Sequence, residues 1–179
     1  MAVVVVAAVG AAVLVQAAPW RQESSPLSPE KVGRCGRTSR APDRAGLAEV
    51  RRQTLCLLNL ERARRGLRRL REVHALDVAS RRHARDMAAR HYLEHVALDG
   101  STPTDRVVRA GYGPHPRLVG ENLAFGDREA GSPASIVGGW MHSPGHRANI
   151  LRRRFREIGI GVALSRRRAY YATDFGRRG

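Results

Sequence analysis

The sequence is poor in cysteine, lysine and aromatic residues, and these shortages exclude several classes of protein. Two cysteines in 179 residues are too few for a disulfide-dense scaffold or a four-cysteine zinc site. Aromatic residues make up 5% of the chain, which leaves few rings on which a single-stranded nucleic acid could stack its bases. The chain also lacks a Walker loop, a Gly-x-Ser-x-Gly elbow, a His-Glu-x-x-His helix and paired Cys-x-x-Cys motifs. The familiar catalytic and nucleotide-binding signatures are therefore absent.

Positive charge is abundant, and almost all of it is arginine. Lys and Arg total 32 against 16 Asp and Glu, giving a formal net charge of +16, and Lys31 is the single lysine. Such an excess predicts salt-sensitive affinity for any polyanion. GC-rich codon usage explains the arginines equally well, so we expect no specific nucleic-acid partner. With 42% hydrophobic residues, the length suits one folded domain.

The first 18 residues have the pattern of an export signal. They carry no charged side chain, and the apolar run from Ala2 to Val15 is short for a membrane-spanning helix. Small residues near Ala17 and Ala18 predict cleavage there, although the absence of an early Lys or Arg leaves an uncleaved anchor open. We predict a secreted, extracellular protein with a signal peptide at 1–18, an irregular arm at 19–45 and a folded domain at 46–179.

The arm is rich in Pro, Ser, Gly and Arg, and it contains one of the two cysteines. Export to an oxidising compartment predicts a disulfide between Cys35 in the arm and Cys56 in the following segment. On the chain-entropy estimate, closing this loop stabilises the fold by ~3 kcal/mol. Two free thiols are the alternative.

Apolar periodicity and turn signals predict helices first and a mixture of helices and strands afterwards. Ser132-Pro133 and Ser143-Pro144 each combine a preferred N-cap residue with proline at the first helical position. The predicted helices cover 47–65, a second stretch that includes 76–88, and then 103–109, 133–142 and 144–151. The predicted strands cover 119–125, 158–164 and 169–175.

Three polar residues near predicted helix and strand ends form a candidate metal site. Two imidazoles and a carboxylate, from His95, Glu121 and His146, can bind a divalent cation such as zinc and leave one position open. The helix N-terminus next to His146 favours its neutral, coordinating form. Three unrelated hydrogen-bonded side chains are the alternative. Ser143 is interpreted as a helix cap rather than a nucleophile, and His83, Trp140 and Phe155 as core residues.

Ordered motifs over 47–176 resemble the CAP superfamily of cysteine-rich secretory, venom-antigen and pathogenesis-related proteins, in its secreted bacterial form. Each motif is weak alone, but their order is specific. They are Leu57-Leu58-Asn59 with Glu61-Arg62-Ala63, Gly66-Leu67 and Leu70; His83-Ala84 with Asp86-Met87; His95 with Asp99-Gly100-Ser101-Thr102-Pro103 and Asp105-Arg106; Gly120-Glu121-Asn122; Trp140-Met141 with Ser143-Pro144-Gly145-His146-Arg147 and Asn149-Ile150-Leu151; Glu157-Ile158-Gly159-Ile160-Gly161; and Tyr171 through Gly176.

The resemblance implies an α+β fold, a three-layer α-β-α sandwich, with His95, Glu121 and His146 meeting in a central cavity. The chain departs from the eukaryotic pattern of two His and two Glu. Ser143 stands about where the second Glu is expected, Tyr171 about where the other His is expected, and Asp174 replaces the usual amide. The implied cavity therefore also includes Ser143, Tyr171 and Asp174, and a full four-residue cation site is in doubt.

The resulting functional hypothesis is a secreted binding protein without a predicted catalytic residue. Its His- and Glu-lined cavity is expected to take a divalent metal, zinc or another cation, a small hydrophobic or lipid ligand, or both. The expected partners are cell-envelope lipid or an anionic wall polymer, and the expected state is a monomer. The alternative is a metal-dependent, protease-like hydrolase in which Glu121 acts as general base.

Overall fold

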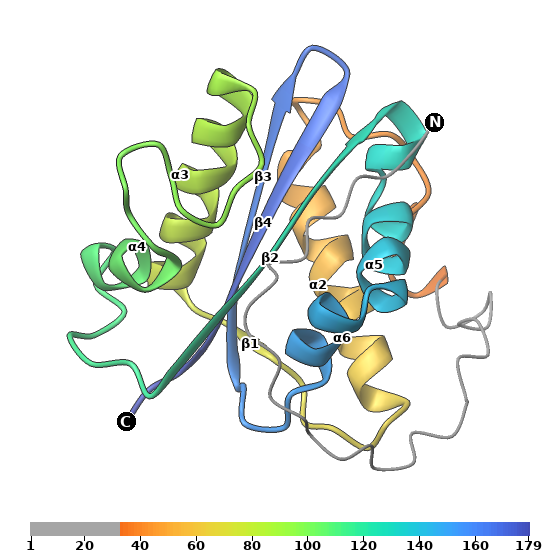
Figure 1. Ribbon diagram of the computed structural model, residues 1–179. Helices are drawn as coiled ribbons and strands as arrows, with labels where there is room; N and C mark the ends of the chain where they lie inside the picture. Colours follow the sequence, from red (N-terminus) through yellow and green to blue (C-terminus); the bar gives the residue numbers. More distant parts are fainter. Residues whose placement is uncertain (1–32) are drawn as a thin grey trace.

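A four-stranded sheet runs through the middle of the molecule, in the strand order β1-β3-β4-β2. The computed structural model describes residues 33–179 (Figure 1). β2 and β4 pair antiparallel, as do β3 and β4, whereas the short β1 is parallel to β3. The strands are β1 (Arg71–Glu72), β2 (Leu118–Asp127), β3 (Glu157–Ser165) and β4 (Arg168–Arg177).

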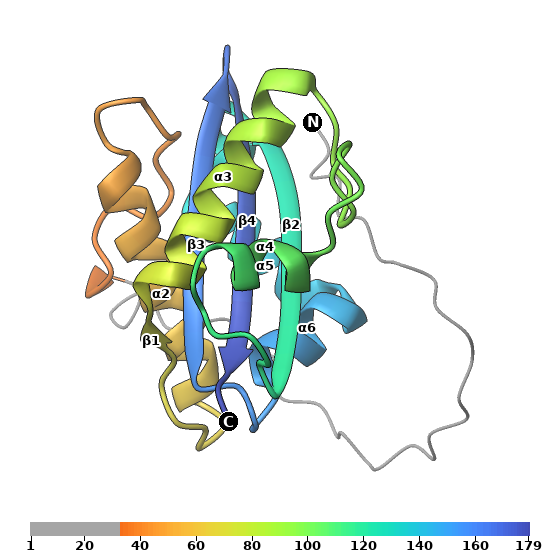
Figure 2. The same cartoon turned by 90° about the vertical axis from the view of Figure 1, so that its left-hand side faces the viewer.

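Helices cover both faces of the sheet and make the outer two layers. α3 (His74–Arg90) and α4 (Pro103–Arg109) lie on one face (Figures 1 and 2). The other face carries α2 (Leu47–Ala63), α5 (Pro133–His142) and α6 (Pro144–Leu151). A single 3-10 turn, η1 (Arg128–Gly131), connects β2 to α5. The predicted α+β fold with an α-β-α sandwich is confirmed.

Local sequence signals explain where the shorter helices begin. At α4, the Thr102 hydroxyl accepts a hydrogen bond from the Asp105 amide while the Asp105 carboxylate accepts one from the Thr102 amide, which is a capping box. The Ser132 hydroxyl accepts from the Ser135 amide at the start of α5. Ser143 occupies the N-cap position of α6, but its hydroxyl makes no capping bond. The three predicted boundaries are confirmed, and the capping role expected for the Ser143 hydroxyl is wrong.

Two glycines let α3 lie unusually close to β3. A Cβ atom on Gly159 would stand 2.0 Å from the carbonyl carbon of Leu76, and one on Gly161 would stand 2.1 Å from the carbonyl oxygen of Ser80. Both contacts are with helix backbone, which cannot move aside as a flexible side chain can. Glycine and large apolar residues therefore alternate in β3 because its two faces pack differently. The glycines allow the close approach of α3 on one face, and Ile158 and Ile160 fill the core beneath α2 on the other.

The side chains of β4 alternate between two buried faces. Tyr171 and Phe175 belong to the cluster packed against α2, α5 and α6, where the Tyr171 ring meets Trp140 edge to face and Phe155 stacks on Phe175. Tyr170 and Ala172 belong instead to the cluster beneath the C-terminal half of α3. Trp140 and Phe155 are 0% and 1% exposed, so their assignment to the core is confirmed.

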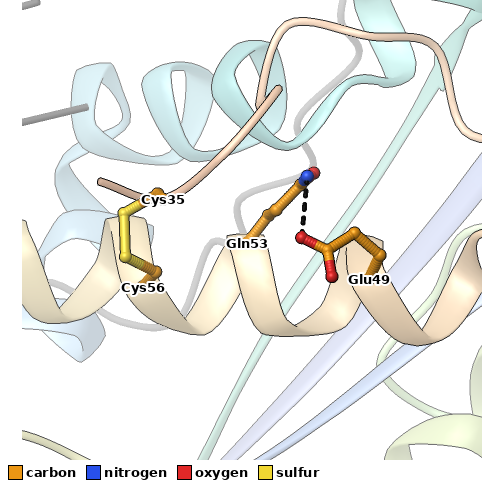
Figure 3. Close-up of a disulfide and its surroundings, with 4 residues drawn as sticks. All are labelled: Cys35, Glu49, Gln53 and Cys56. Atoms are coloured by element: carbon orange, nitrogen blue, oxygen red, sulfur yellow. Dashed lines mark hydrogen bonds between the residues drawn. A yellow bond between two sulfur atoms is a disulfide. The ribbon is translucent and has the colours of Figure 1, made fainter. Parts of the chain in front are cut away.

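The arm is joined covalently to α2. Cys35 and Cys56 form a disulfide with Cα atoms 5.6 Å apart, which confirms the predicted pairing (Figure 3). One turn earlier on α2, the Gln53 amide donates to the Glu49 carboxylate over 3.1 Å. The Thr38 carbonyl oxygen also accepts from the Ala134 amide at the start of α5. The described part of the arm is thus held against the layer of α2 and α5.

Two expectations concern membrane and export. The predicted signal peptide at 1–18 lies outside the described residues. Within residues 33–179, no helix combines the length and apolarity that a membrane-spanning segment requires.

Candidate functional site

Glu121 is the centre of a buried polar cluster on the α3 face of the sheet. It lies on β2, and its side chain is 1% exposed. The Nδ1 atom of His95, in the loop after α3, donates to Glu121 Oε1 over 2.7 Å. The guanidinium of Arg106 donates to Oε2 over the same distance. The carboxylate is therefore held between two donors, one of them a permanent cation, which makes burial of its charge tolerable.

Arg106 is a member of the site that the sequence analysis did not single out. Its terminal nitrogen donates to the Ser101 carbonyl oxygen over 2.7 Å, and the capping box at the start of α4 fixes the turn from which it projects. Its Nε is buried and makes no hydrogen bond with residues 33–179. The signal available in the sequence was an arginine directly beside the apolar Val107 of a short capped helix.

His83 lies on α3 next to the same carboxylate and is a core residue, as predicted. Its Nε2 is 3.0 Å from the Glu94 carbonyl oxygen and 3.9 Å from Glu121 Oε2. Since a carbonyl only accepts, Nε2 carries the proton and Nδ1 is left bare. Nδ1 is buried and has no partner among the described residues. Burial lowers the pKa of His83 below its usual value despite the opposing effect of Glu121, so the ring is neutral at pH 7.

Asp174 faces Glu121 across the β2–β4 pair and is 0% exposed. Its Oδ2 accepts from the Ser80 hydroxyl over 2.7 Å, while Oδ1 has no partner among residues 33–179. Burial first, and the neighbouring Glu121 charge second, raise the pKa of Asp174 well above its usual range. These effects favour the protonated form of the side chain, which resembles the amide that the family resemblance implies at this position.

The predicted site residues Ser143 and His146 lie at the start of α6, where Ser143 is the N-cap residue and His146 is in the first turn. The Ser143 hydroxyl and His146 Nδ1 are 2.8 Å apart. The backbone of His146 is tied to β2 through Asn122, whose amide donates to the His146 carbonyl oxygen over 3.1 Å. Asn149 donates to both the Glu121 carbonyl oxygen and Asn122 Oδ1. Two asparagines therefore connect α6 to the strand that carries Glu121.

The predicted ligand set of His95, Glu121 and His146 does not fit a metal ion. Within residues 33–179, no three His, Cys, Asp or Glu side chains are grouped closely enough to hold one. One physical reason is Arg106, whose guanidinium already occupies the second carboxylate oxygen of Glu121. We therefore derive neither a metal-binding function nor a metal-assisted hydrolytic step from this cluster.

Tyr171, predicted as a cavity residue, lies on the opposite face of the sheet from Asp174. Side chains alternate along a strand, so a residue three positions from Asp174 projects away from Glu121. The Tyr171 hydroxyl donates to the Gly131 carbonyl oxygen over 2.7 Å, and burial raises its pKa. Its inclusion in the cavity with Asp174 is wrong, and it belongs to the packing around Trp140.

A surface pocket of about 250 Å³ opens above the Arg106 end of the cluster, between α3, α4 and the loop that joins them. Its polar lining is rich in guanidinium groups, three of which pair with acidic residues. The residues that carry charge or polarity at the pocket are Arg82, His83, Asp86, Arg90, Asp99, Ser101, Arg106 and Arg109. Arg82 forms no salt bridge with any residue of the described chain. In the loop, Ala97 and Asp99 line the pocket, while Val96 and Leu98 are 52% and 59% exposed.

The sandwich and the ordered Gly-Glu-Asn, Ser-Pro-Gly-His and C-terminal strand motifs define the fold of a cysteine-rich secretory protein domain. The family model described as "CAP: Cysteine-rich secretory protein family" matches residues 55–175. The chain belongs to this family, and the resemblance inferred from the motifs is confirmed.

Two curated relatives come from Bacillus subtilis. Protein YkwD is 30% identical over 144 residues, which cover 80% of this chain and 53% of YkwD. The membrane protein YlbC is 31% identical over 129 residues, which cover 71% of this chain and 34% of YlbC. The chain thus spans about half of one relative and a third of the other.

Two solved structures share the fold. An extracellular SCP-domain protein of Bacillus anthracis matches with a TM-score of 0.63 and 26% identity, over 87% of this chain and 45% of that one. An outer surface protein of Borrelia burgdorferi matches with a TM-score of 0.63 and 21% identity, over 70% of this chain and 90% of that one. The Bacillus anthracis protein is described as extracellular, which is consistent with the predicted export, whereas the likeness to the Borrelia protein concerns the fold alone.

Proposed function

We propose that this chain is an extracellular binding domain that attaches to anionic lipid of the cell envelope through the pocket between α3 and α4. The observation that carries the proposal is the pairing of an arginine-lined pocket with an apolar rim. Arg82 and Arg109 provide cationic groups for a phosphate, and Val96 and Leu98 stand exposed on the loop that forms one wall.

The apolar rim has a physical reason to meet a lipid surface. Val96 and Leu98 are the large hydrophobic residues that stand exposed in the described chain. They alternate with Ala97 and Asp99, which turn toward the pocket. A loop that lies against a cationic pocket and projects two aliphatic side chains into solvent suits the boundary between headgroups and acyl chains. The formal net charge of +16 adds long-range attraction to the same surface.

The buried cluster supports the pocket rather than performing chemistry. Glu121 holds Arg106 in place, and Arg106 in turn binds the Ser101 carbonyl oxygen at the base of the loop. His95, 27% exposed at its side chain, contacts the other oxygen of the same carboxylate. The loop that carries the apolar rim is therefore anchored to the sheet at both ends.

Vesicle sedimentation tests the proposal. The purified protein should sediment with vesicles of phosphatidylcholine and phosphatidylglycerol and much less with phosphatidylcholine alone, and added salt should weaken binding because it screens the charges. Leu98→Ser and Arg82→Gln should each weaken binding several-fold. The matched control is Ala148→Ser, an exposed site on α6 across the sheet. Equal binding by all four proteins would refute the proposal.

A further inference from the structure

The outer edge of β3 is open over most of its length. β1 pairs with β3 only at Glu157 and Ile158, whereas β4 pairs with the other edge along all of β3. Backbone groups alternate between the two edges of a strand, so those of Ile160, Val162 and Leu164 point to the same side as Ile158. The Ile160 amide donates to the Asp77 carboxylate on that side, over 2.9 Å. Beyond this bond, no strand within residues 33–179 completes the edge.

This open edge lies at the floor of a groove of about 540 Å³ between α2 and α3. The floor is formed by Val162, Ala163 and Leu164, of which the first two are only 4% and 7% exposed. In Figure 2, β3 lies at the left-hand edge of the three long strands, with α3 in front of it and α2 behind. The edge is therefore recessed between two helices. This position leaves room for one extended chain and prevents another sheet from pairing with it edge to edge.

Four arginines rim the groove, two on each wall. Arg44 and Arg51 come from the start of α2 and the residues before it, and Arg81 and Arg85 are one turn apart on α3. None of the four forms a salt bridge with any residue between 33 and 179. Glu72 and Asp77, near the β1 end of the groove, interact electrostatically with Arg51 and Arg81. The Asp77 carboxylate also accepts the hydrogen bond from the Ile160 amide of β3.

We propose that the β3 edge binds an acidic peptide segment, which adds to the sheet as an extended strand. Val162 and Leu164 each offer an amide and a carbonyl group, which a peptide backbone satisfies and a lipid does not. Successive side chains of the added strand project toward opposite walls. Neighbouring acidic residues on that strand would thus meet the arginines of α2 and those of α3. This surface is separate from the lipid-binding pocket and independent of its function.

Fluorescence anisotropy with a labelled eight-residue peptide of Val and Glu tests the binding on the intact protein. The peptide should bind, its Lys-for-Glu counterpart should not, and Arg81→Glu with Arg85→Glu should weaken binding about tenfold or more. The matched control, Arg152→Glu with Arg153→Glu, changes the net charge equally at exposed sites and should leave most of the affinity. No binding by the acidic peptide, or equal loss in both double variants, would overturn the proposal.

N-methylation of the peptide separates strand addition from simple charge attraction without altering the protein. Methyl groups on one set of alternate amides should abolish binding, because those amides bond to β3, while methylation of the other set should leave binding nearly unchanged. Equal tolerance of both sets would contradict strand addition. Anionic vesicles that compete through Arg81 and Arg85, with no effect of either methylation pattern, would identify the groove as a lipid site and overturn the proposal.

Discussion

Glu121 and Asp174 are opposite each other on β2 and β4, two buried carboxyl groups on the same face of the sheet. The two groups are tolerated together because their surroundings differ. Glu121 is compensated by Arg106 and His95. Asp174, whose carboxyl accepts from the Ser80 hydroxyl, has a pKa raised by burial and by the Glu121 charge, which favours its protonated form. Protonation of Asp174 reduces the repulsion between the two carboxyl groups, and the charge of Glu121 is compensated by its own partners.

The first prediction concerns pH. A carboxyl group with a raised folded-state pKa contributes stability below its unfolded pKa of about 3.9 and loses that contribution as pH rises through the folded value. Between the unfolded and the folded pKa of Asp174, this group alone should therefore lower the unfolding free energy of the protein by up to about 1.4 kcal/mol for each unit by which the pH rises. Asp174→Asn, which keeps the shape and an accepting oxygen, should remove this slope in urea titrations at several pH values. An unchanged slope would contradict a raised pKa of Asp174.

The second prediction concerns the cation at Glu121. Arg106→Gln leaves a buried carboxylate without its permanent counter-charge and should lower the unfolding free energy by about 3 kcal/mol or more. Arg109→Gln, on the same helix, removes an exposed pair with Asp99 and should change stability little. Adding Glu121→Gln to Arg106→Gln should recover part of the loss. Equal effects of the two single variants in denaturant unfolding would show that Arg106 does not compensate Glu121.

The sequence predicted the elements that have local signals. Thr102-Pro103 and Ser132-Pro133 determine their helix starts through capping and proline geometry, whereas Ser143-Pro144 does so through proline geometry without a capping bond from the Ser143 hydroxyl. All three helices lie where they were expected. β1 was not predicted, because a two-residue strand exists only through its pairing with β3. Helix α2 ends at Ala63 rather than 65, since the chain turns earlier, toward a Gly66 with positive φ.

The composition of the site was less accessible to sequence analysis than the fold. His95 and Glu121 meet as the resemblance implied. The role of Arg106 depends on how α4 packs against β2, which no local pattern encodes. The separation of Tyr171 from Asp174 follows from their odd spacing on one strand, so the alternation of side chains could have revealed it. A residue joined to the site by tertiary contacts, such as Arg106, could not be assigned from spacing alone.

The third prediction concerns the close approach of α3 to β3. Gly161→Ala would place a methyl group 2.1 Å from the Ser80 carbonyl oxygen, so helix and strand would have to separate. The unfolding free energy of this variant should fall by more than about 3 kcal/mol, which is beyond the usual range for a point substitution. Gly138→Ala is the matched control, because nothing lies within 4 Å of its added Cβ and it sits inside α5. That variant should be neutral or gain about 0.5–1 kcal/mol. Similar thermal stability of both variants would contradict the packing.

The fourth prediction concerns the disulfide. Replacing Cys35 and Cys56 together by Ser should lower the unfolding free energy by about 2–4 kcal/mol, because the unfolded chain is no longer cross-linked. A reducing agent should shift the unfolding midpoint of the parent protein to that of the double variant and leave the variant unchanged. A parent protein that is insensitive to reduction would show that the arm adds no stability through this bond.

The central claim is that the loop carrying Val96 and Leu98 enters an anionic lipid surface, and an environment-sensitive fluorophore tests it most directly. We would attach the fluorophore to a cysteine introduced by Leu98→Cys and, in a second protein, by Ala148→Cys on α6. Vesicles containing phosphatidylglycerol should shift the emission of the first label to shorter wavelength and leave the second unchanged, because only the first is carried into an apolar environment. An unshifted first label, or equal shifts at both positions, would contradict the account.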